Sequence, residues 1–273
     1  MDRINQNIKI LFFGDVNGKI GRDGLKKALP KLTAKWQPDL ILANGENLAH
    51  GLGATETTIL EMQAAGINYF TGGNHLWDKP QIEELLRQPN NPIISPSNYI
   101  GSHFSPGEKI IHFKQFKLLI INLVGRVFVD EQNEYSCPFK MLDSLLKKYA
   151  TEKLNGIIVD FHAEATSEKE ALGWHADGRI SALFGTHTHV QTSDAVIKAQ
   201  GTAYITDLGM VGAANSIIGT KIETTLPAFL NQTKFSCDIP ETGPAKINGV
   251  FIEIDPKTSL AQSIQPFNLT TAI

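Results

Sequence analysis

The sequence is poor in the features of exported, membrane-spanning and disulfide-stabilised proteins. Its 273 residues include two cysteines, Cys137 and Cys237, which lie far apart and form no CxxC pair. A disulfide framework or a cysteine zinc site is therefore not expected, and two reduced thiols are the better interpretation. The apolar run in MDRINQNIKILFF is too short for a signal sequence, and no run approaches the ~18 residues of a membrane span. We expect a cytoplasmic protein that makes no membrane contact.

The sequence also lacks an excess of charge of either sign. It has 25 Lys and Arg against 28 Asp and Glu, a formal net charge of -3 at pH 7. A protein that grips duplex DNA usually presents a broad basic field, so duplex DNA is not an expected partner. A small anionic substrate would have to be held locally, by metals or backbone donors. No segment resembles a linker, so we expect residues 1–273 to form a single domain, and a homo-oligomer is compatible with the sequence.

Short apolar segments alternate with longer amphipathic ones along the chain. Residues 8–16, 39–47 and 67–75 each begin as an aliphatic strand and end in a polar cluster, and residues 21–36 and 55–66 between them have helical periodicity. Residues 109–125 predict two strands with a tight connection. Residues 155–165 and 179–190 predict strands that end in histidines. This alternation predicts an α/β fold, in which ligands bind where the carboxyl ends of strands open into loops.

Two further predictions concern the second half of the chain. Ser167 and Glu170 have the spacing of a capping box, which predicts a short helix between the strands of residues 155–165 and 179–190. After a late strand in residues 249–256, the last residues have the character of a peripheral tail.

Metal-competent side chains follow five of the predicted strands. They are Asp15, Glu46 with Asn47, Asn74 with His75, His162, and His187 with His189. Singly, each has a structural explanation: Asp15 could be a turn residue, Asn74 a helix cap and His162 a buried histidine. Packing alone does not account for the whole set at strand ends. His187 and His189 are two residues apart and would point the same way in an extended segment. Carboxylate, amide and imidazole groups together suit manganese, iron or zinc better than magnesium.

These residues also carry a family resemblance. The ordered motifs GDV, NGEN, GGNHLWD, DFHAEATSE and GTHTHVQT resemble those of the calcineurin-like metallophosphoesterase superfamily. Glu46, where most members have Asp, and the segments DFHAEATSE, GTHTHVQT and TAYITDLGM resemble one branch, the YmdB-like 2′,3′-cyclic-nucleotide 2′-phosphodiesterases. The resemblance extends from Asp15 to about Met210. It implies a four-layer α/β/β/α sandwich of mixed sheets, with two divalent or trivalent metal ions in a cleft.

The resemblance further implies a role for each residue of the set. One metal ion would be held by Asp15, Asn47 and His189, and the other by Asn74, His162 and His187. Glu46 would bridge the two ions. Asn47 could instead be a hydrogen-bond donor to the ligands. His75 would be the general acid. Iron and manganese are the expected ions, with zinc as an alternative.

Such a site suits the hydrolysis of a small phosphodiester or nucleotide. Two metal ions about 3.5–4 Å apart can hold a hydroxide in line with phosphorus, and His75 can protonate the leaving oxygen. The expected reaction converts 2′,3′-cyclic nucleotides to 3′-nucleotides. A phosphomonoesterase or nucleotidase with the same dimetal core, and a metal-loaded regulatory or RNA-associated binding protein, are the alternatives. His50, Arg126 and Arg179 are candidate substrate contacts, whereas His175 has the character of a surface or rim histidine.

Overall fold

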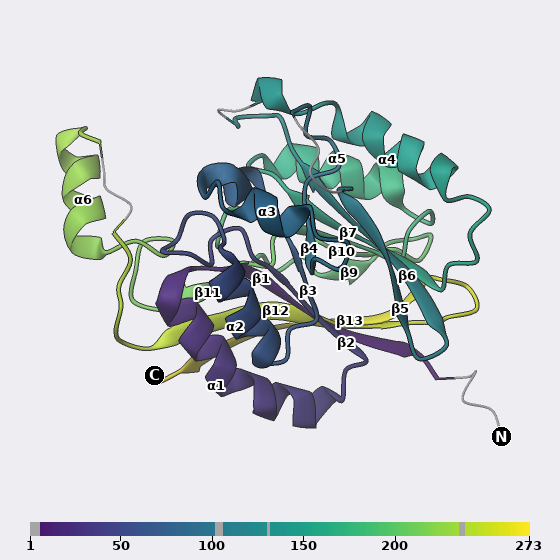
Figure 1. The fold of residues 1–273 in the computed structure, drawn as a ribbon, viewed down its shortest axis with the longest axis horizontal. Coiled ribbons are helices and arrows are strands. Elements are labelled where there is room, and N and C mark those ends of the chain that lie inside the picture. Colours follow the sequence, from purple (N-terminus) through teal and green to yellow (C-terminus); the bar gives the residue numbers. More distant parts are fainter. Residues whose placement is uncertain (1–5, 102–105, 130–131, 235–237) are drawn as a thin grey trace.

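The computed structural model describes residues 6–101, 106–129, 132–234 and 238–273, so Cys237 lies outside the described residues. Cys137 is a free, half-buried cysteine. Two mixed β-sheets lie face to face in the interior of the molecule (Figure 1).

The first sheet is centred on the N-terminal strand. Within the described residues it has seven strands in the order β13-β12-β11-β1-β2-β3-β4. Their bounds are β1 (Ile8–Val16), β2 (Leu40–Asn44), β3 (Tyr69–Thr71), β4 (Ile93–Ile94), β11 (Met210–Ala213), β12 (Ala245–Ile254) and β13 (Ala261–Thr271). Strand β1 pairs in parallel with β2 and β11 and antiparallel with β12, which makes the sheet mixed.

The second sheet is built from the middle of the chain. In the part of the chain that the structure describes, this sheet has six strands in the order β5-β6-β7-β8-β10-β9. Their bounds are β5 (Glu108–Phe113), β6 (Phe116–Val124), β7 (Gly156–His162), β8 (Ala182–Thr186), β9 (Val196–Ile197) and β10 (Ala203–Ile205). Strands β6, β7 and β8 are parallel, and β5 joins β6 as the antiparallel hairpin that the sequence predicts.

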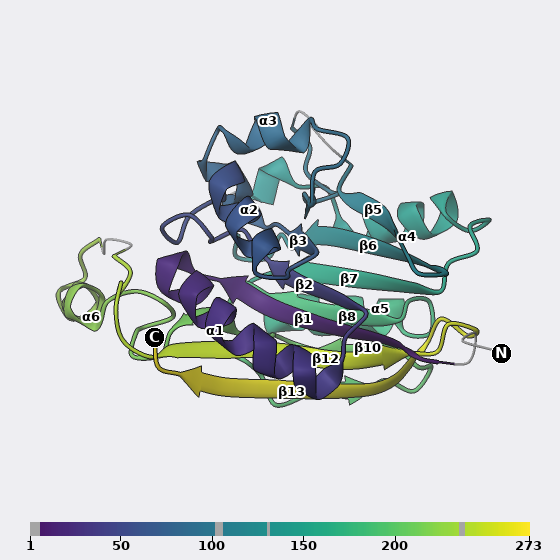
Figure 2. The ribbon, with the colours of Figure 1, turned by 60° about the horizontal axis from the view of Figure 1, so that its bottom comes forward.

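Helices cover the outer faces of both sheets. The helices of the described residues are α1 (Gly18–Trp36), α2 (Glu56–Ala64), α3 (Ile82–Leu86), α4 (Pro138–Lys148), α5 (Thr166–Ala176) and α6 (Ile222–Asn231), with the 3-10 helices η2 (Asn74–Asp78) and η3 (Gln132–Glu134). Helices α4 and α5 lie on one side of the strands and α1 and α2 on the other (Figure 1), and α1 runs along β12 and β13 (Figure 2). Helix α6 stands apart from these layers (Figure 1).

Three apolar cores separate the layers. In β1, Leu11 and Phe13 pack with the helices of the first sheet, whereas Ile10 and Phe12 pack between the two sheets. Successive strand residues point to opposite faces, so this apolar strand serves two cores. A third core joins the second sheet to α4 and α5. The predicted four-layer α/β/β/α sandwich is therefore confirmed. No helix of the described segments is both long and apolar enough to cross a membrane.

Two predictions for the second half of the chain are wrong. The last residues are not a peripheral tail, because β13 pairs with β12 along its length and Phe267 packs in the core beneath α1. Helix α5 begins at Thr166, and its N-cap residue Ala165 makes no side-chain cap. The predicted helix therefore forms, but without the capping box of Ser167 and Glu170. Glu168 in its first turn accepts the backbone N–H groups of Arg126 and Val127.

Candidate metal centre

The side chains predicted to bind metals come together from both sheets. From the first sheet, Asp15 lies on β1, Glu46 and Asn47 follow β2, and Asn74 begins η2 after β3. From the second sheet, His162 ends β7, and His187 and His189 follow β8. The carboxylates of Asp15 and Glu46 and the ring of His162 are at most 1% exposed. The structure thus places the whole predicted set in one cluster, in which Asn74, His187 and His189 are partly exposed.

One half of the cluster is centred on His162. Its Nε2 atom lies 3.0 Å from Asn74 Oδ1, 3.0 Å from His187 Nδ1 and 3.2 Å from Glu46 Oε1. Candidate ligand atoms of Glu46, His162 and His187 all lie within 4.8 Å of one another. This separation is compatible with a shared ion.

The other half of the cluster surrounds His189. Its Nε2 atom lies 3.9 Å from Asp15 Oδ1 and 3.3 Å from Asn47 Nδ2. Asn47 Nδ2 also donates to Glu46 Oε1 at 3.0 Å. Asn47 therefore makes the hydrogen bonds of a donor to its neighbours, while its Oδ1 atom is left for a metal. Glu46 contacts both halves of the cluster.

Each histidine ring is oriented from outside the cluster. His162 Nδ1 donates to Thr186 Oγ1 at 2.9 Å, because the Thr186 hydroxyl in turn donates to Asp160 Oδ1 at 2.7 Å. His187 Nε2 lies 3.1 Å from Glu164 Oε2. His189 Nδ1 lies 2.7 Å from the carbonyl oxygen of residue 218. In each ring the second nitrogen then faces the cluster, as in metal-binding histidines of known sites.

The backbone of His187 and His189 differs from the extended segment that their spacing suggested. The two residues have φ values of 101° and 64°, in the left-handed region that non-glycine residues seldom adopt. The two rings nevertheless line the same cavity. His187 contacts His162, whereas His189 contacts Asn47.

Thr188, between these two histidines, is fixed by a buried ion pair. Asp207 accepts the Thr188 backbone N–H at 3.1 Å and its hydroxyl at 2.7 Å. The same carboxylate accepts Lys169 Nζ at 2.7 Å, and the side chains of Lys169 and Asp207 are 0% and 1% exposed. This pair connects α5 to the histidine loop and stabilises its unusual backbone.

The carboxylates around His162 favour a positive charge on its ring. Burial alone would lower the pKa of His162, but the carboxylates of Glu46, Asp15 and Asp160 raise this pKa to about 9. For His187, burial and the neighbouring His162 lower the pKa to about 3. Its imidazole is therefore neutral at physiological pH, which is the form that binds metals.

The donor groups present fit metal ions. Asp15 Oδ1 and Asn47 Oδ1 are buried and have no hydrogen-bond partner among the described residues, which is unusual for polar atoms. A Cβ atom on Gly73 would lie 2.0 Å from Glu46 Oε2, so only glycine allows the chain to approach this carboxylate. Carboxylate, amide and imidazole donors suit iron, manganese or zinc.

A cavity of about 290 Å³ opens onto the cluster. It is lined by Asn17, Glu46, Asn47, Gly51, Leu52, His75, Glu164, His187, Thr188, His189, Ile218 and Thr220. His75 Nδ1 lies 2.8 Å from Asp78 Oδ2, and the His75 side chain is 34% exposed. Asp78 thus holds one ring nitrogen, so Nε2 is left to exchange a proton with a substrate.

Several other candidate residues do not contribute to this cavity. Arg179 Nη2 pairs with Asp143 at 2.6 Å, and His175 Nε2 contacts the same carboxylate at 2.9 Å. Arg126 does not line the cavity, and His50 lines a neighbouring one of about 280 Å³. The prediction that Arg179 could reach phosphate is wrong, because Asp143 engages its guanidinium group elsewhere.

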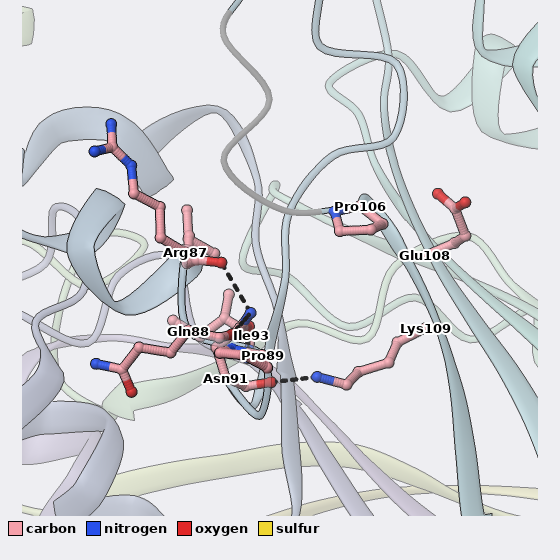
Figure 3. A pocket seen from close by; sticks show the side chains of 9 residues that line it. Arg87, Gln88, Pro89, Asn91, Ile93, Pro106, Glu108 and Lys109 are labelled. Carbon is pink, nitrogen blue, oxygen red and sulfur yellow. Dashed lines mark hydrogen bonds between the residues drawn. The ribbon is translucent and has the colours of Figure 1, made fainter.

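A different cavity, of about 220 Å³, lies between α3 and β5 (Figure 3). Lys109 Nζ in it donates to the carbonyl oxygen of Asn91, and Asn91 Nδ2 donates to that of Leu86 at 3.0 Å. Glu108 accepts from Lys148 Nζ at 2.7 Å. These groups connect loops to strands, so we assign this cavity no chemistry.

The side chains that orient the ligands were missed by sequence reasoning. Asp160 carried a signal, because it is a charge inside an apolar strand and lies on the same strand face as His162, two residues later. Asp78 likewise follows His75 by three residues, one helical turn. Glu164 and Asp207 stand in the motifs quoted above, but no local pattern distinguishes them from surface carboxylates.

The stacked mixed sheets, with a histidine and carboxylate cluster at their edge, define a metallophosphoesterase-like protein. The chain belongs to the YmdB-like protein family, whose model matches residues 11–267. A Bacillus subtilis protein named 2′,3′-cyclic-nucleotide 2′-phosphodiesterase is 42% identical over 260 residues, which cover 94% of this chain and 96% of that protein.

Solved structures agree with this assignment. A structure described as a novel phosphatase from Mycoplasma pneumoniae is 35% identical, with a TM-score of 0.90 over 97% of this chain and 94% of that one. A hypothetical protein from Thermus thermophilus is also 35% identical, with a TM-score of 0.87 over 96% of this chain and 99% of that one. The NAD nucleotidase of Haemophilus influenzae shares the fold at 15% identity, with a TM-score of 0.62 over 97% of this chain and 56% of that one.

Proposed function

We propose that this protein is a metal-dependent phosphodiesterase that hydrolyses 2′,3′-cyclic nucleotides to 3′-nucleotides. The convergence of seven metal-competent side chains in one cluster, beside a cavity that His75 also lines, supports this proposal most directly. The Bacillus subtilis relative is named for the same activity and matches nearly the whole chain.

The proposed roles follow the two halves of the cluster. Asp15, Asn47 and His189 would hold one ion, Asn74, His162 and His187 would hold the other, and Glu46 would contribute to both. We propose iron or manganese, with zinc as the alternative. A pair of such ions supplies Lewis-acid stabilisation to a phosphate and activates water.

His75 completes the reaction as the general acid. Attack of water on phosphorus breaks the bond to the 2′ oxygen, which must take up a proton as it leaves. His75 lines the cavity and donates that proton from Nε2, while its Nδ1 is held 2.8 Å from Asp78 Oδ2. The remaining product is a 3′-nucleotide.

Phosphomonoester hydrolysis is the second candidate activity, because the relative from Mycoplasma pneumoniae is described as a phosphatase. Glu164 favours the diesterase. Its carboxylate lines the cavity and is 46% exposed, so it repels the second negative charge of a monoester.

We also propose that the protein acts in the cytoplasm and that residues 1–273 form one domain. The free Cys137 supports a reducing compartment. The core shared between the two sheets supports a single folding unit.

The test is hydrolysis of 2′,3′-cyclic AMP by the purified protein with Mn²⁺ or Fe²⁺, with the 2′- and 3′-monophosphates resolved. We expect metal-dependent release of 3′-AMP that is absent in the Asp15→Ala variant. 3′-AMP is offered in parallel, and its faster hydrolysis would establish the monoesterase instead. If the metal-loaded protein turns over neither substrate, the alternative is a binding or regulatory role.

A further inference from the structure

A tight turn between β11 and α6 lies at the mouth of the candidate active site. The backbones of Ile217 and Thr220 exchange two hydrogen bonds of 2.9 Å each, which leaves Ile218 and Gly219 at the centre of the turn. Both central residues have positive φ, 45° for Ile218 and 104° for Gly219. Two consecutive positive φ values are typical of a type I′ turn, which prefers Asn-Gly. Gly219 fits this preference and Ile218 does not.

Ile218 is costly at this position. The left-handed region brings Cβ too close to the backbone, and a β-branched side chain adds to the strain. Burial does not offset the cost, because the residue is 53% exposed. A strained residue that gains little packing suggests a function, since proteins retain such strain mainly where activity needs it.

The position of the turn indicates what this function is. Among the described residues that line the cavity, only Leu52 and Ile218 have hydrocarbon side chains larger than a methyl group; the rest are polar, charged or glycine. His189 Nδ1 contacts the carbonyl oxygen of Ile218 at 2.7 Å, so the turn is fixed beside the metal cluster. A substrate with its phosphate at the cluster therefore finds apolar surface at these two residues.

We propose that Ile218 binds the nucleoside part of the substrate and thereby favours nucleotides over other phosphate esters. This inference rests on the proposed function, because that function places the phosphate of a nucleotide at the cluster. Leu52 supplies apolar surface from the loop after β2. The cost of the backbone strain at Ile218 is then offset by tighter binding of the substrate.

The experiment compares the binding of 3′-AMP and of inorganic phosphate to the metal-loaded protein by calorimetry. The Ile218→Asn variant gives the turn its preferred residue and removes the hydrocarbon side chain. We expect a higher thermal midpoint, unchanged phosphate affinity and about tenfold weaker 3′-AMP binding. Ile218→Gly should also weaken 3′-AMP binding, which excludes an effect of the new amide, and Ile218→Val should retain most of it.

A matched control is Gln232→Gly. Gln232 is an exposed residue with φ of 54° at the end of α6, so this change relieves the same kind of backbone strain away from the cavity. It should raise the midpoint and leave 3′-AMP binding unchanged.

Four outcomes would overturn the inference. The first three are unchanged 3′-AMP binding in Ile218→Asn, a lower thermal midpoint for this variant, and wild-type protein that binds 3′-AMP no more tightly than phosphate. An equal loss of both affinities, with loss of metal, would place the effect at His189 and overturn it too. Because the comparison needs no turnover, failure to hydrolyse cyclic nucleotides would reject the proposed function alone.

Discussion

At the scale of single residues, the candidate ligands depend on neighbours that are not ligands. His162 is oriented through Thr186 by Asp160, His187 contacts Glu164, and His189 contacts a backbone carbonyl group. A contact to one ring nitrogen fixes the tautomer of the histidine, and the other ring nitrogen is left to bind the metal. These contacts allow binding and catalysis to be tested separately.

His75 should be needed for catalysis and not for metal binding. Its ring contacts Asp78, outside the cluster. We expect His75→Ala to lose about 10²–10⁴-fold in the rate of diester hydrolysis, as general acids typically contribute. Elemental analysis should find the metal content of the wild type, and Asp78→Asn should reduce the rate less. If His75→Ala loses metal, then His75 belongs to the ligand set.

Thr186 should affect metal affinity through His162. Thr186→Val keeps the shape of the side chain but removes the hydroxyl that connects His162 to Asp160. We expect metal affinity, measured by competition with a chelator, to fall about 10–100-fold. Thr71→Val is the matched control, since Thr71 also donates to Asp160 and, among the described residues, no hydrogen bond joins it to a histidine. Equal effects of the two variants would contradict a specific role of Thr186.

At the scale of secondary-structure elements, α5 supports the site although it contributes no ligand. Glu168 holds the loop after β6, and Lys169 holds Asp207 and, through it, Thr188. Helix α5 therefore fixes two loops at the edge of the second sheet. A substitution that destabilises α5 should therefore lower the free energy of unfolding and also displace the loop that carries His187 and His189.

The Lys169–Asp207 pair should be the costliest ion pair to break. Both side chains are almost fully buried, so Lys169→Met leaves a buried carboxylate unpaired. We expect a loss of about 3–5 kcal/mol in the free energy of unfolding, measured with urea. Arg179→Met is the control, because Arg179 and its partner Asp143 are 39% and 47% exposed; there the expected loss is about 0–1 kcal/mol. Similar losses in both variants would show that burial does not decide the cost.

The elements differ in how far the sequence predicts them. The strand at residues 8–16 agrees with β1, because its apolar residues are buried on both faces. The edge strand β13 was missed because its alternation is weak, with Gln, Asn and Thr on its exposed face. The left-handed backbone of His187 and His189 was also missed, since the contacts that hold it come from Asp207 and Asn47, far away in sequence.

At the scale of the whole molecule, the candidate site joins the two sheets. Asp15, Glu46 and Asn74 come from the first sheet, whereas His162 and His187 come from the second. The order of the motifs was enough to predict the sandwich and the membership of this cluster. The residues that orient the ligands were not predictable, because each is defined by a contact between distant segments.

Because the site joins both sheets, bound metal should stabilise the entire fold. Removing the ions leaves His162 as the cationic group beside the buried carboxylates of Asp15 and Glu46. Ligand binding to the folded state alone adds about 2.7 kcal/mol at a hundredfold excess over Kd. We therefore expect chelation to lower the thermal midpoint by about 5–10 °C, and added Mn²⁺ to restore it. Asp15→Ala should show a smaller shift, since it has lost one ligand. An unchanged midpoint in wild-type protein that elemental analysis shows to have lost its metal would mean that the cluster does not couple metal binding to the stability of the fold.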